Sequence, residues 1–552
     1  MPGPRVRRWG GRTGRRLALA LVVTGLSLAA SPGRAAAHAG LESSIPAASA
    51  TLQEAPADIV LDFDEPIEAS ISTIELFDAD ARSVEVGDPE PSQGDDSIVV
   101  AALPDLDEGI YAVVWRVGSA DGHIVDGAFS FRIGTGGSGV ADDLIDEVRS
   151  GAQAGPSVDR TADVARLLGF VGLTVVVGAG LFAAMSPRRL TDRRATSVLL
   201  IGGWVVLMIG TLASFGLYGA EAVAGDLGDA FSPEVWGQVA ETRNGWLLLV
   251  RSVLVLAIGA VTWLGLRRPP VRATSWWQAG AVGLAIAIIL TYPSSGHPSA
   301  ESPRSLWVLI DGVHLGAAVV WLGGQVLFAA GGAAWFTDDG ERTVRRFSAV
   351  ATVLVPIVVV TGSVQTFRLA GDLDDFTETG WGRTLLVKLS IVVVLLAIAG
   401  VSRWLLRNVG LLSLRRTIVA EACVGVVVLA VAASLVSQPP QPIDQGSVFS
   451  ASLAQAGVLV DVTLTPGRVG PNEVHLVVTP PGGSLTPVTD ATARMKLPSR
   501  SLPASPVTIE QDGANHYTGA ITLPFDGDWT LEIVIEVSPG NSVLMTTTVP
   551  IP

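Results

Sequence analysis

The sequence contains few of the side chains that usually bind metals or carry electrons. Its 552 residues include a single cysteine, Cys423, so an intrachain disulfide and a thiolate cluster are both excluded. This cysteine lies in an apolar run, and we expect it to serve packing. Only six histidines and five methionines are present. No glycine-rich phosphate loop, paired-carboxylate site or Ser/His/Asp set is evident, so the sequence predicts neither an enzyme nor an ATP-driven pump.

The sequence is also too apolar for an ordinary soluble protein. Hydrophobic residues make up 49% of the chain and the mean hydropathy is +0.46. Residues 161–438 hold eight apolar runs, each long enough to cross a bilayer as a helix. We place these runs near 163–185, 196–220, 245–266, 275–292, 305–335, 346–369, 383–402 and 417–437.

Charge is distributed unevenly among the loops that join these runs. Arginines gather after the first, third, fifth and seventh runs, whereas the other loops carry aspartate and glutamate. Arginine-rich loops stay in the cytoplasm, so both ends of the chain are expected outside. The sequence therefore predicts a multi-pass protein of a bacterial plasma membrane, with both soluble domains extracytoplasmic.

Residues 1–37 have the pattern of a signal peptide. A basic start is followed by the apolar stretch 17–30 and by the small residues 35–37. Cleavage after Ala37 removes seven arginines and no acidic residue, so the formal net charge changes from −15 to −22. An acidic chain of this kind repels nucleic acid and attracts cations. Cleavage also makes His38 the new N-terminus.

The regions on either side of the membrane segment alternate between apolar and polar residues with a period of two. Residues 111–117 form one such row and residues 458–464 another. Short strands between Gly, Pro and Asp turns predict an all-β Greek-key sandwich and a second all-β sandwich. The expected fold class is mixed and multidomain, with the eight-helix α transmembrane bundle between them. The predicted parts are a β-sandwich at 38–133, a flexible linker at 134–160, the bundle at 161–438 and a β-sandwich at 439–552.

A candidate metal site combines His38 with Asp121 and His123. A processed N-terminal histidine offers its α-amino nitrogen and its imidazole, which can hold a metal in one chelate ring. His123 adds a second imidazole and Asp121 a carboxylate, and Gly122 permits the turn between them. Nitrogen-rich sets favour Cu(II). On spacing alone, a chance terminal histidine beside an ordinary turn histidine stays an alternative.

Residues 38–133 resemble the CopC family of periplasmic copper-binding proteins. The resemblance rests on the start HAGLESSIPA, the segment VLDFDEPIE and the run YAVVWRVGSADGHIVDGAFSF. It implies a Cu(II) site made by His38 with its α-amine, Asp121 and His123. Some members of the family also have a methionine-rich Cu(I) site. This domain has no methionine, so the resemblance does not extend to that Cu(I) site.

A second candidate set, His297, Asp311 and His314, lies in the membrane region. Asp311 and His314 are three residues apart in the fifth run and therefore share a helix face. His314 is about nine residues, or roughly 13 Å, from the outer end of its helix. Ionisable groups at such depth face the bundle interior and are functional candidates. If the fourth and fifth helices are antiparallel neighbours, the three groups converge. The alternative is a packing pair held by mutual hydrogen bonds.

The membrane region resembles the CopD family, through SGHP, HLGAAVVWLGG, RFS and GRTLLVKL. The resemblance implies copper movement across the inner membrane, with the histidines of these motifs as suspected ligands. Two stretches near the end, PGRVGPNEVHLVVTPPGG and HYTGAITLPFDGDWTLEIVIEV, resemble YtkA-like domains. We expect their histidines, His475 and His516, to be solvated or edge residues. Lys388 and Glu421 are interpreted as snorkelling or interhelically paired charges.

These features predict a CopC–CopD fusion that captures Cu(II) outside the plasma membrane and mediates copper import. The expected partners are copper ions and the membrane, with extracytoplasmic copper chaperones as candidates and nucleic acid excluded. The sequence indicates no oligomeric state. Two alternatives stay open. One is a sequestration or tolerance protein without transport. The other is a haem-binding electron-transfer protein, which would need paired axial histidines on facing helices.

Overall fold

The computed structural model separates into two compact units. One contains the helices between 154 and 442 together with Gly122 and His123, and the other contains the strands of both β domains. The structure describes residues 39–46, 51–52, 54–63, 65–92, 94–119, 122–134, 144–145, 148, 156–191, 194–268, 271, 274–299, 303–336, 338–370, 375–410, 414–438, 449–465, 467–480, 488–500, 504–513 and 515–551.

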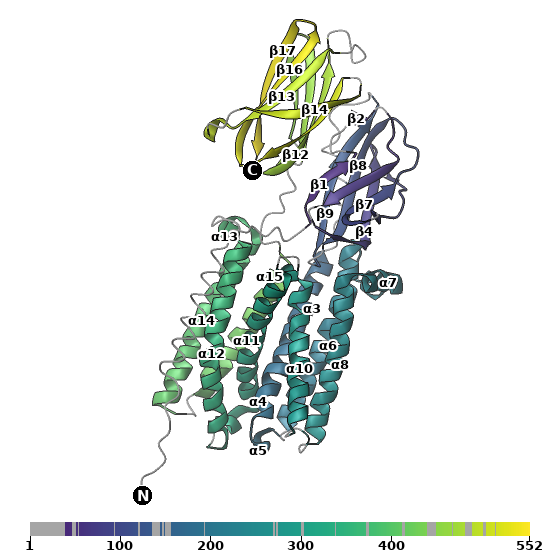
Figure 1. Ribbon diagram of the computed structural model, residues 1–552. Coiled ribbons are helices and arrows are strands. Elements are labelled where there is room, and N and C mark those ends of the chain that lie inside the picture. The colour runs from purple at the N-terminus through teal and green to yellow at the C-terminus, as the bar shows by residue number, and fades with distance from the viewer. Residues whose placement is uncertain are drawn as a thin grey trace. The chain divides into compact units, whose positions relative to one another are not determined.

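The N-terminal β domain consists of two sheets, with strand orders β1-β3-β7-β6 and β2-β9-β8-β4-β5 (Figure 1). Alternation places Ile59, Leu61 and Phe63 of β3 in the core between them. Trp115 of β8 meets Phe63 edge-on at 5.2 Å. The predicted sandwich is confirmed. The strands are β1 (Leu41–Ile45), β2 (Thr51–Leu52), β3 (Asp58–Phe63), β4 (Ile67–Asp78), β5 (Ser83–Val84), β6 (Glu90–Ser92), β7 (Asp95–Ala102), β8 (Gly109–Ser119) and β9 (Ile124–Ile133).

Part of the predicted linker is ordered against this domain. Leu144 and Val148 are helical and buried, and they pack against Ile110, Ala112 and Val114. These three residues belong to the face of β8 that points away from the sandwich core. The predicted flexible linker is therefore wrong at these residues, because their apolar side chains cover a face of β8 that would otherwise be exposed. The first membrane helix begins at Pro156, before the predicted end of the linker at 160.

Among the described residues, eight helices are long and apolar enough to cross a membrane, as predicted. They lie side by side in Figure 1. The first span joins α3 (Pro156–Leu173), the π-helical turn η1 (Thr174–Ala179) and α4 (Gly180–Ala184). The others are α6 (Arg194–Ala222), α8 (Arg243–Arg267), α10 (Ser275–Thr291), α11 (Arg304–Gly331), α12 (Asp338–Leu369), α14 (Gly380–Asn408) and α15 (Leu414–Val436). Shorter helices are α5 (Arg188–Thr191), η2 (Asp229–Phe231), α7 (Pro233–Glu241), η3 (Pro293–Ser295), η4 (His297–Ser299), η5 (Gly332–Phe336) and α13 (Asp375–Glu378).

The fifth predicted span, 305–335, is a helix followed by a turn. The helix α11 ends at Gly331, and Gly332 adopts φ 62° and ψ −150°, a conformation that other residues rarely reach. The chain then forms the short 3₁₀ helix η5, whose Trp335 and Phe336 are buried. The apolar run is therefore longer than the helix because its last aromatic residues pack back into the bundle.

The first and fifth spans touch through their backbones. A Cβ atom on Gly178 would lie 2.1 Å from the Val319 carbonyl oxygen, and one on Gly323 would lie 2.5 Å from the Ala179 nitrogen. All six residues of η1 are buried at this crossing. Small residues allow such close approach between membrane helices, where packing rather than the hydrophobic effect holds helices together.

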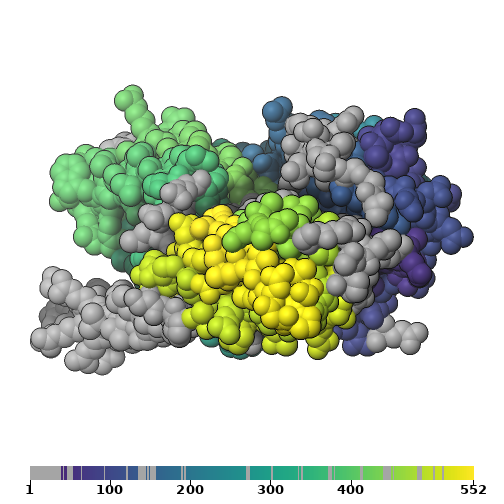
Figure 2. Space-filling model, turned by 90° about the horizontal axis from the view of Figure 1, so that it is seen from above, coloured from purple at the N-terminus to yellow at the C-terminus, as the bar shows by residue number. Residues whose placement is uncertain are grey.

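The C-terminal domain is one eight-stranded sheet of order β10-β11-β12-β15-β14-β13-β16-β17, whose first and last strands contact each other. Its core includes Val460, Leu476, Leu531 and Ile533, each fully buried. Figure 2 shows this domain in yellow and yellow-green. The predicted all-β domain is confirmed, as a near-barrel. The strands are β10 (Phe449–Gln455), β11 (Val458–Thr465), β12 (Gly470–Thr479), β13 (Asp490–Lys496), β14 (Ser505–Gly513), β15 (His516–Leu523), β16 (Gly527–Ser538) and β17 (Asn541–Ile551), with the 3₁₀ turn η7 (Pro498–Arg500).

Candidate metal centre

Of the predicted N-terminal ligands, only His123 lies within the described residues; His38 and Asp121 lie outside them. His123 follows Gly122, whose φ of +83° is a backbone conformation that favours glycine. His123 belongs to the same compact unit as the membrane helices. Its Nε2 donates a hydrogen bond to the Val436 carbonyl oxygen at 2.8 Å, at the end of α15. Its ring centroid lies 4.6 Å from that of His297.

His297 begins the short helix η4, and two arginines of α8 hold the segment that carries it. Arg243 donates to the Ser294 carbonyl oxygen at 2.7 Å. Arg251 donates from Nε to the Thr291 hydroxyl at 2.8 Å and from a terminal nitrogen to the Thr291 carbonyl at 2.9 Å. The Arg251 guanidinium also stacks on the Tyr292 ring at 3.8 Å. His297 is thus positioned by a charged group that is only 6% exposed, which the sequence interpretation did not single out.

Asp311 and His314 both face α12, one helical turn apart. Gln365 donates to Asp311 Oδ1 at 2.9 Å, and His314 Nδ1 lies 2.9 Å from the Thr361 hydroxyl. Since Thr361 gives its own hydrogen to the Ile357 carbonyl at 2.6 Å, it accepts the Nδ1 hydrogen of His314. In this neutral tautomer the metal-binding lone pair of His314 is on Nε2. Lys388 of α14 attracts Asp311 electrostatically and disfavours positive charge on His314, but no ion pair joins it to either residue among the described side chains.

The structure does not gather His297, Asp311 and His314 into one site. Among the described residues, no three His, Cys, Asp or Glu side chains are arranged to hold a metal ion together. The reason is the orientation of α11. Its polar face turns toward α12, whereas His297 lies against His123. The predicted convergence is therefore absent from this conformation.

A second polar cluster lies farther along α11, beyond His314. Gln325 donates to one carboxylate oxygen of Glu421 at 2.5 Å, and the Ser402 hydroxyl donates to the other. Glu421 is 3% exposed. Its predicted interhelical pairing is thus present, with partners on α11 and α14. Gln325 was missed because an uncharged amide in an apolar run gives a weak signal. Cys423, in contrast, is exposed on α15, so its predicted packing role is wrong.

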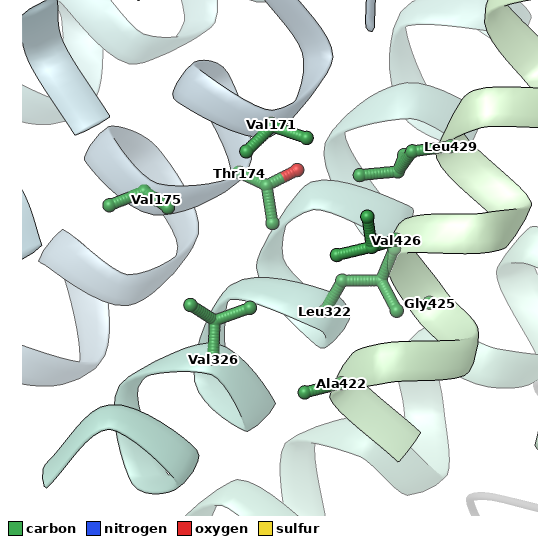
Figure 3. Close-up of a pocket in the computed structure, with 9 residues that line it drawn as sticks. All are labelled: Val171, Thr174, Val175, Leu322, Val326, Ala422, Gly425, Val426 and Leu429. Atoms are coloured by element: carbon green, nitrogen blue, oxygen red, sulfur yellow. The ribbon is translucent and has the colours of Figure 1, made fainter. Parts of the chain in front are cut away.

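One cavity lies between the first span, α11 and α15 (Figure 3). Its volume is about 90 Å³. Eight of the nine residues that line it carry no polar side chain, and the ninth, Thr174, donates its hydroxyl to the Phe170 carbonyl at 2.8 Å. Such a lining offers no good copper ligand, because copper prefers imidazole, thiolate and thioether groups. The cavity is therefore not a candidate metal centre.

The C-terminal histidines differ from the prediction. His475 is only 6% exposed, so the expectation of a solvated or edge residue is wrong for it. Its ring stacks on that of His516, with centroids 5.6 Å apart. The period-two pattern correctly assigns His475 to the face opposite Val474 and Leu476. It does not indicate that neighbouring side chains bury that face as well.

Comparisons with known families agree with this architecture. The CopC domain matches residues 41–134, the copper resistance protein D-like N-terminal domain matches residues 158–302, and copper resistance protein D matches residues 341–435. The chain is a CopC–CopD fusion. It joins two copper-handling families, both of which are binding or transport families rather than enzymes. The YtkA-like interpretation of residues 439–552 stays a prediction.

Individual relatives of the fusion match either most of its length or its CopC domain. The copper transport protein CutJ of Bacillus subtilis (strain 168) is 25% identical over 82% of this chain and 84% of its own. Copper resistance protein C of Xanthomonas campestris pv. juglandis is 34% identical over 22% of this chain and 96% of its own. The crystal structure of CopC from Methylosinus trichosporium OB3b covers 18% of this chain and 98% of its own, at 27% identity and a TM-score of 0.17.

Proposed function

We propose that this fusion captures Cu(II) outside the plasma membrane and passes it inward through the membrane unit. The observation that carries the proposal is the 4.6 Å approach of the His123 and His297 rings. His123 belongs to the predicted capture motif, and His297 lies in the connection between the fourth and fifth spans. Two imidazoles this close can bind one copper ion in turn after small side-chain rotations.

The proposed transfer is a ligand exchange. Cu(II) held by His38, Asp121 and His123 gains a bond to His297 before it loses the bond to His123. The ion keeps its charge throughout, so the step needs no electron donor. Exchange of this kind favours neutral imidazoles, which are good copper ligands near neutral pH. The arginines that hold residues 291–299 keep His297 in place for the exchange.

The next proposed ligand is His314, through Nε2. Asp311 supplies negative charge one helical turn away, and Gln365 orients its carboxylate. Lys388 acts in the opposite direction, since its ammonium group repels a cation at His314. A site with one imidazole and a nearby positive charge binds copper weakly. Weak binding is compatible with transport, because an ion must dissociate from each binding site along its path as well as bind to it.

The test is copper accumulation in cells that express the chain, measured against cells that lack it. His297→Ala should reduce accumulation to the level of cells without the chain, while the purified variant still binds Cu(II) at its N-terminal site. Leu309→Ala, which changes an exposed residue of α11, is the matched control and should accumulate copper normally. Normal accumulation by His297→Ala would contradict the proposal.

The same cells test the two other interpretations. A sequestration protein would raise the copper bound by the cells in proportion to the amount of the protein. It would leave the cytoplasmic copper concentration unchanged, as measured with an intracellular copper reporter. A haem protein would show a Soret band after purification. The contacts of His314 do not favour haem, because its partner on the facing helix α12 is Thr361.

A further inference from the structure

The two histidines of the C-terminal domain form a cluster that the proposed copper path does not use. His475 lies on β12 and His516 on β15. The strands pair His475 with Thr518 and Val477 with His516, so both imidazoles leave the same face of the sheet. Their ring planes are inclined by only 27°. Two neighbouring imidazoles on a rigid sheet are a preorganised pair of metal ligands.

His475 is buried in a way that needs an explanation. Neither of its ring nitrogens makes a hydrogen bond within the part of the chain that the structure describes. Oε1 of Glu473 lies 3.3 Å from Nε2 of His475 without forming a hydrogen bond to it. Burying a polar ring without hydrogen bonds costs free energy. A bound ion is one of the few arrangements that removes this cost.

The surroundings of the pair favour a cation. Glu473 precedes His475 by two residues and therefore shares its face. Asp461 of β11 pairs with Val477, and Glu510 of β14 pairs with Thr518, so both carboxylates lie on that face too. Glu473 and His516 are only partly buried, so the pair lies near the surface of the sheet.

We propose that His475 and His516 bind one copper ion, with Glu473 balancing its charge. No third His, Cys, Asp or Glu in the described structure completes a metal-binding group with them. The two imidazoles are therefore the protein ligands, and water fills the remaining positions. Zinc shares this ligand chemistry. The choice of copper rests on the proposed function of the fusion, whereas the site itself rests on the geometry of β12 and β15.

The experiment uses the full chain in detergent, with His38, His123, His297 and His314 all changed to alanine. The chain has six histidines, so this parent keeps only the C-terminal pair. The parent is dialysed against Cu(II) sulfate or, separately, Zn(II) sulfate, and bound metal is counted per chain. We expect one copper ion per chain, with an electron paramagnetic resonance spectrum that shows imidazole nitrogen coupling.

Three further variants of this parent decide the assignment. His475→Gln and His516→Gln should each lose the bound copper, whereas Thr518→Ala, on the same face, should keep it. Copper binding unchanged by His475→Gln would overturn the proposal, and so would binding of zinc without copper. If either glutamine variant fails to fold, the spectrum of the parent decides, because a bound copper without imidazole coupling also overturns the site. The result is independent of uptake, so this site can fail while the proposed function stands.

Discussion

At the residue scale, Glu68 on β4 couples the stability of the N-terminal β domain to pH. Burial, and secondarily the nearby Asp96 carboxylate, raise its pKa from 4.5 to about 7. Because the folded pKa is above the unfolded one, the folded state binds the proton more tightly. The stabilisation is complete below about pH 4.5 and is lost as the pH rises through about 7.

The prediction uses Glu68→Gln, which mimics the protonated form at every pH. The variant should match the natural chain near pH 4.5 and exceed its stability at pH 8. For a fully buried group, a pKa shift of this size corresponds to a change of about 3 kcal/mol in the free energy of unfolding. Because Glu68 is partly exposed, we expect a change of roughly 1–2 kcal/mol. Thermal unfolding of the β domains, followed by circular dichroism at both pH values, measures it. A stability difference that does not change with pH would contradict this interpretation.

His314 is the second prediction at this scale. His314→Ala removes the Nε2 lone pair and should reduce copper accumulation to that of cells without the chain. Cu(II) binding at the N-terminal site should be unchanged, since that site shares no residue with α11. The control is Val313→Ala, because Val313 is the neighbouring residue and is 42% exposed. Normal copper accumulation by a folded, inserted His314→Ala protein would contradict this prediction. It would show that His314 and its hydrogen bond to Thr361 serve helix packing only.

At the element scale, the crossing of the first span and α11 depends on glycine. Gly178→Ala places a methyl group against the Val319 carbonyl oxygen, where the backbone would have to move. Overpacking of this kind costs about 1–3 kcal/mol. We expect a lower unfolding temperature in detergent. Gly283→Ala on α10 is the control, since an added Cβ meets nothing within 4 Å there. Equal unfolding temperatures for the two variants would show that the first span and α11 can move apart at their crossing without a loss of stability.

The elements were the most predictable part of the molecule. Each of the eight predicted apolar runs corresponds to a candidate membrane-spanning helix. The thickness of the bilayer fixes the length of such a helix, and this length can be read from the sequence as the length of the apolar run. The site was less predictable. Alternation along β12 assigns His475 to a face but says nothing about what covers it. The spacing of Asp311 and His314 gives a shared face, but only packing decides that this face meets α12. No signal in the sequence singled out Arg251, because its stacking partner, Tyr292, is distant in the sequence and lies just after the end of α10.

At the scale of the whole molecule, the arginine-rich loops predict the orientation of the chain. Reporter fusions after Leu190, Arg268 and Arg407 should report cytoplasm, and fusions after Gly228 or at Pro552 should report the exterior. Alkaline phosphatase and green fluorescent protein fusions give opposite readouts for the two sides. A cytoplasmic signal at Pro552 would mean that one of the eight candidate helices does not cross the membrane.

The arrangement of the C-terminal sheet affects how readily its edge strands can pair with other chains. Its first strand, β10, contacts its last, β17, so the row of strands returns on itself. An open sheet exposes unpaired amide and carbonyl groups at its rims, where strands of other chains can add. Here the two edge strands lie in contact with each other. A chain with one cysteine cannot lock such a domain with an internal disulfide. The contact between β10 and β17 instead limits the room for a foreign strand at either edge, so we expect the domain to add no strands from other chains.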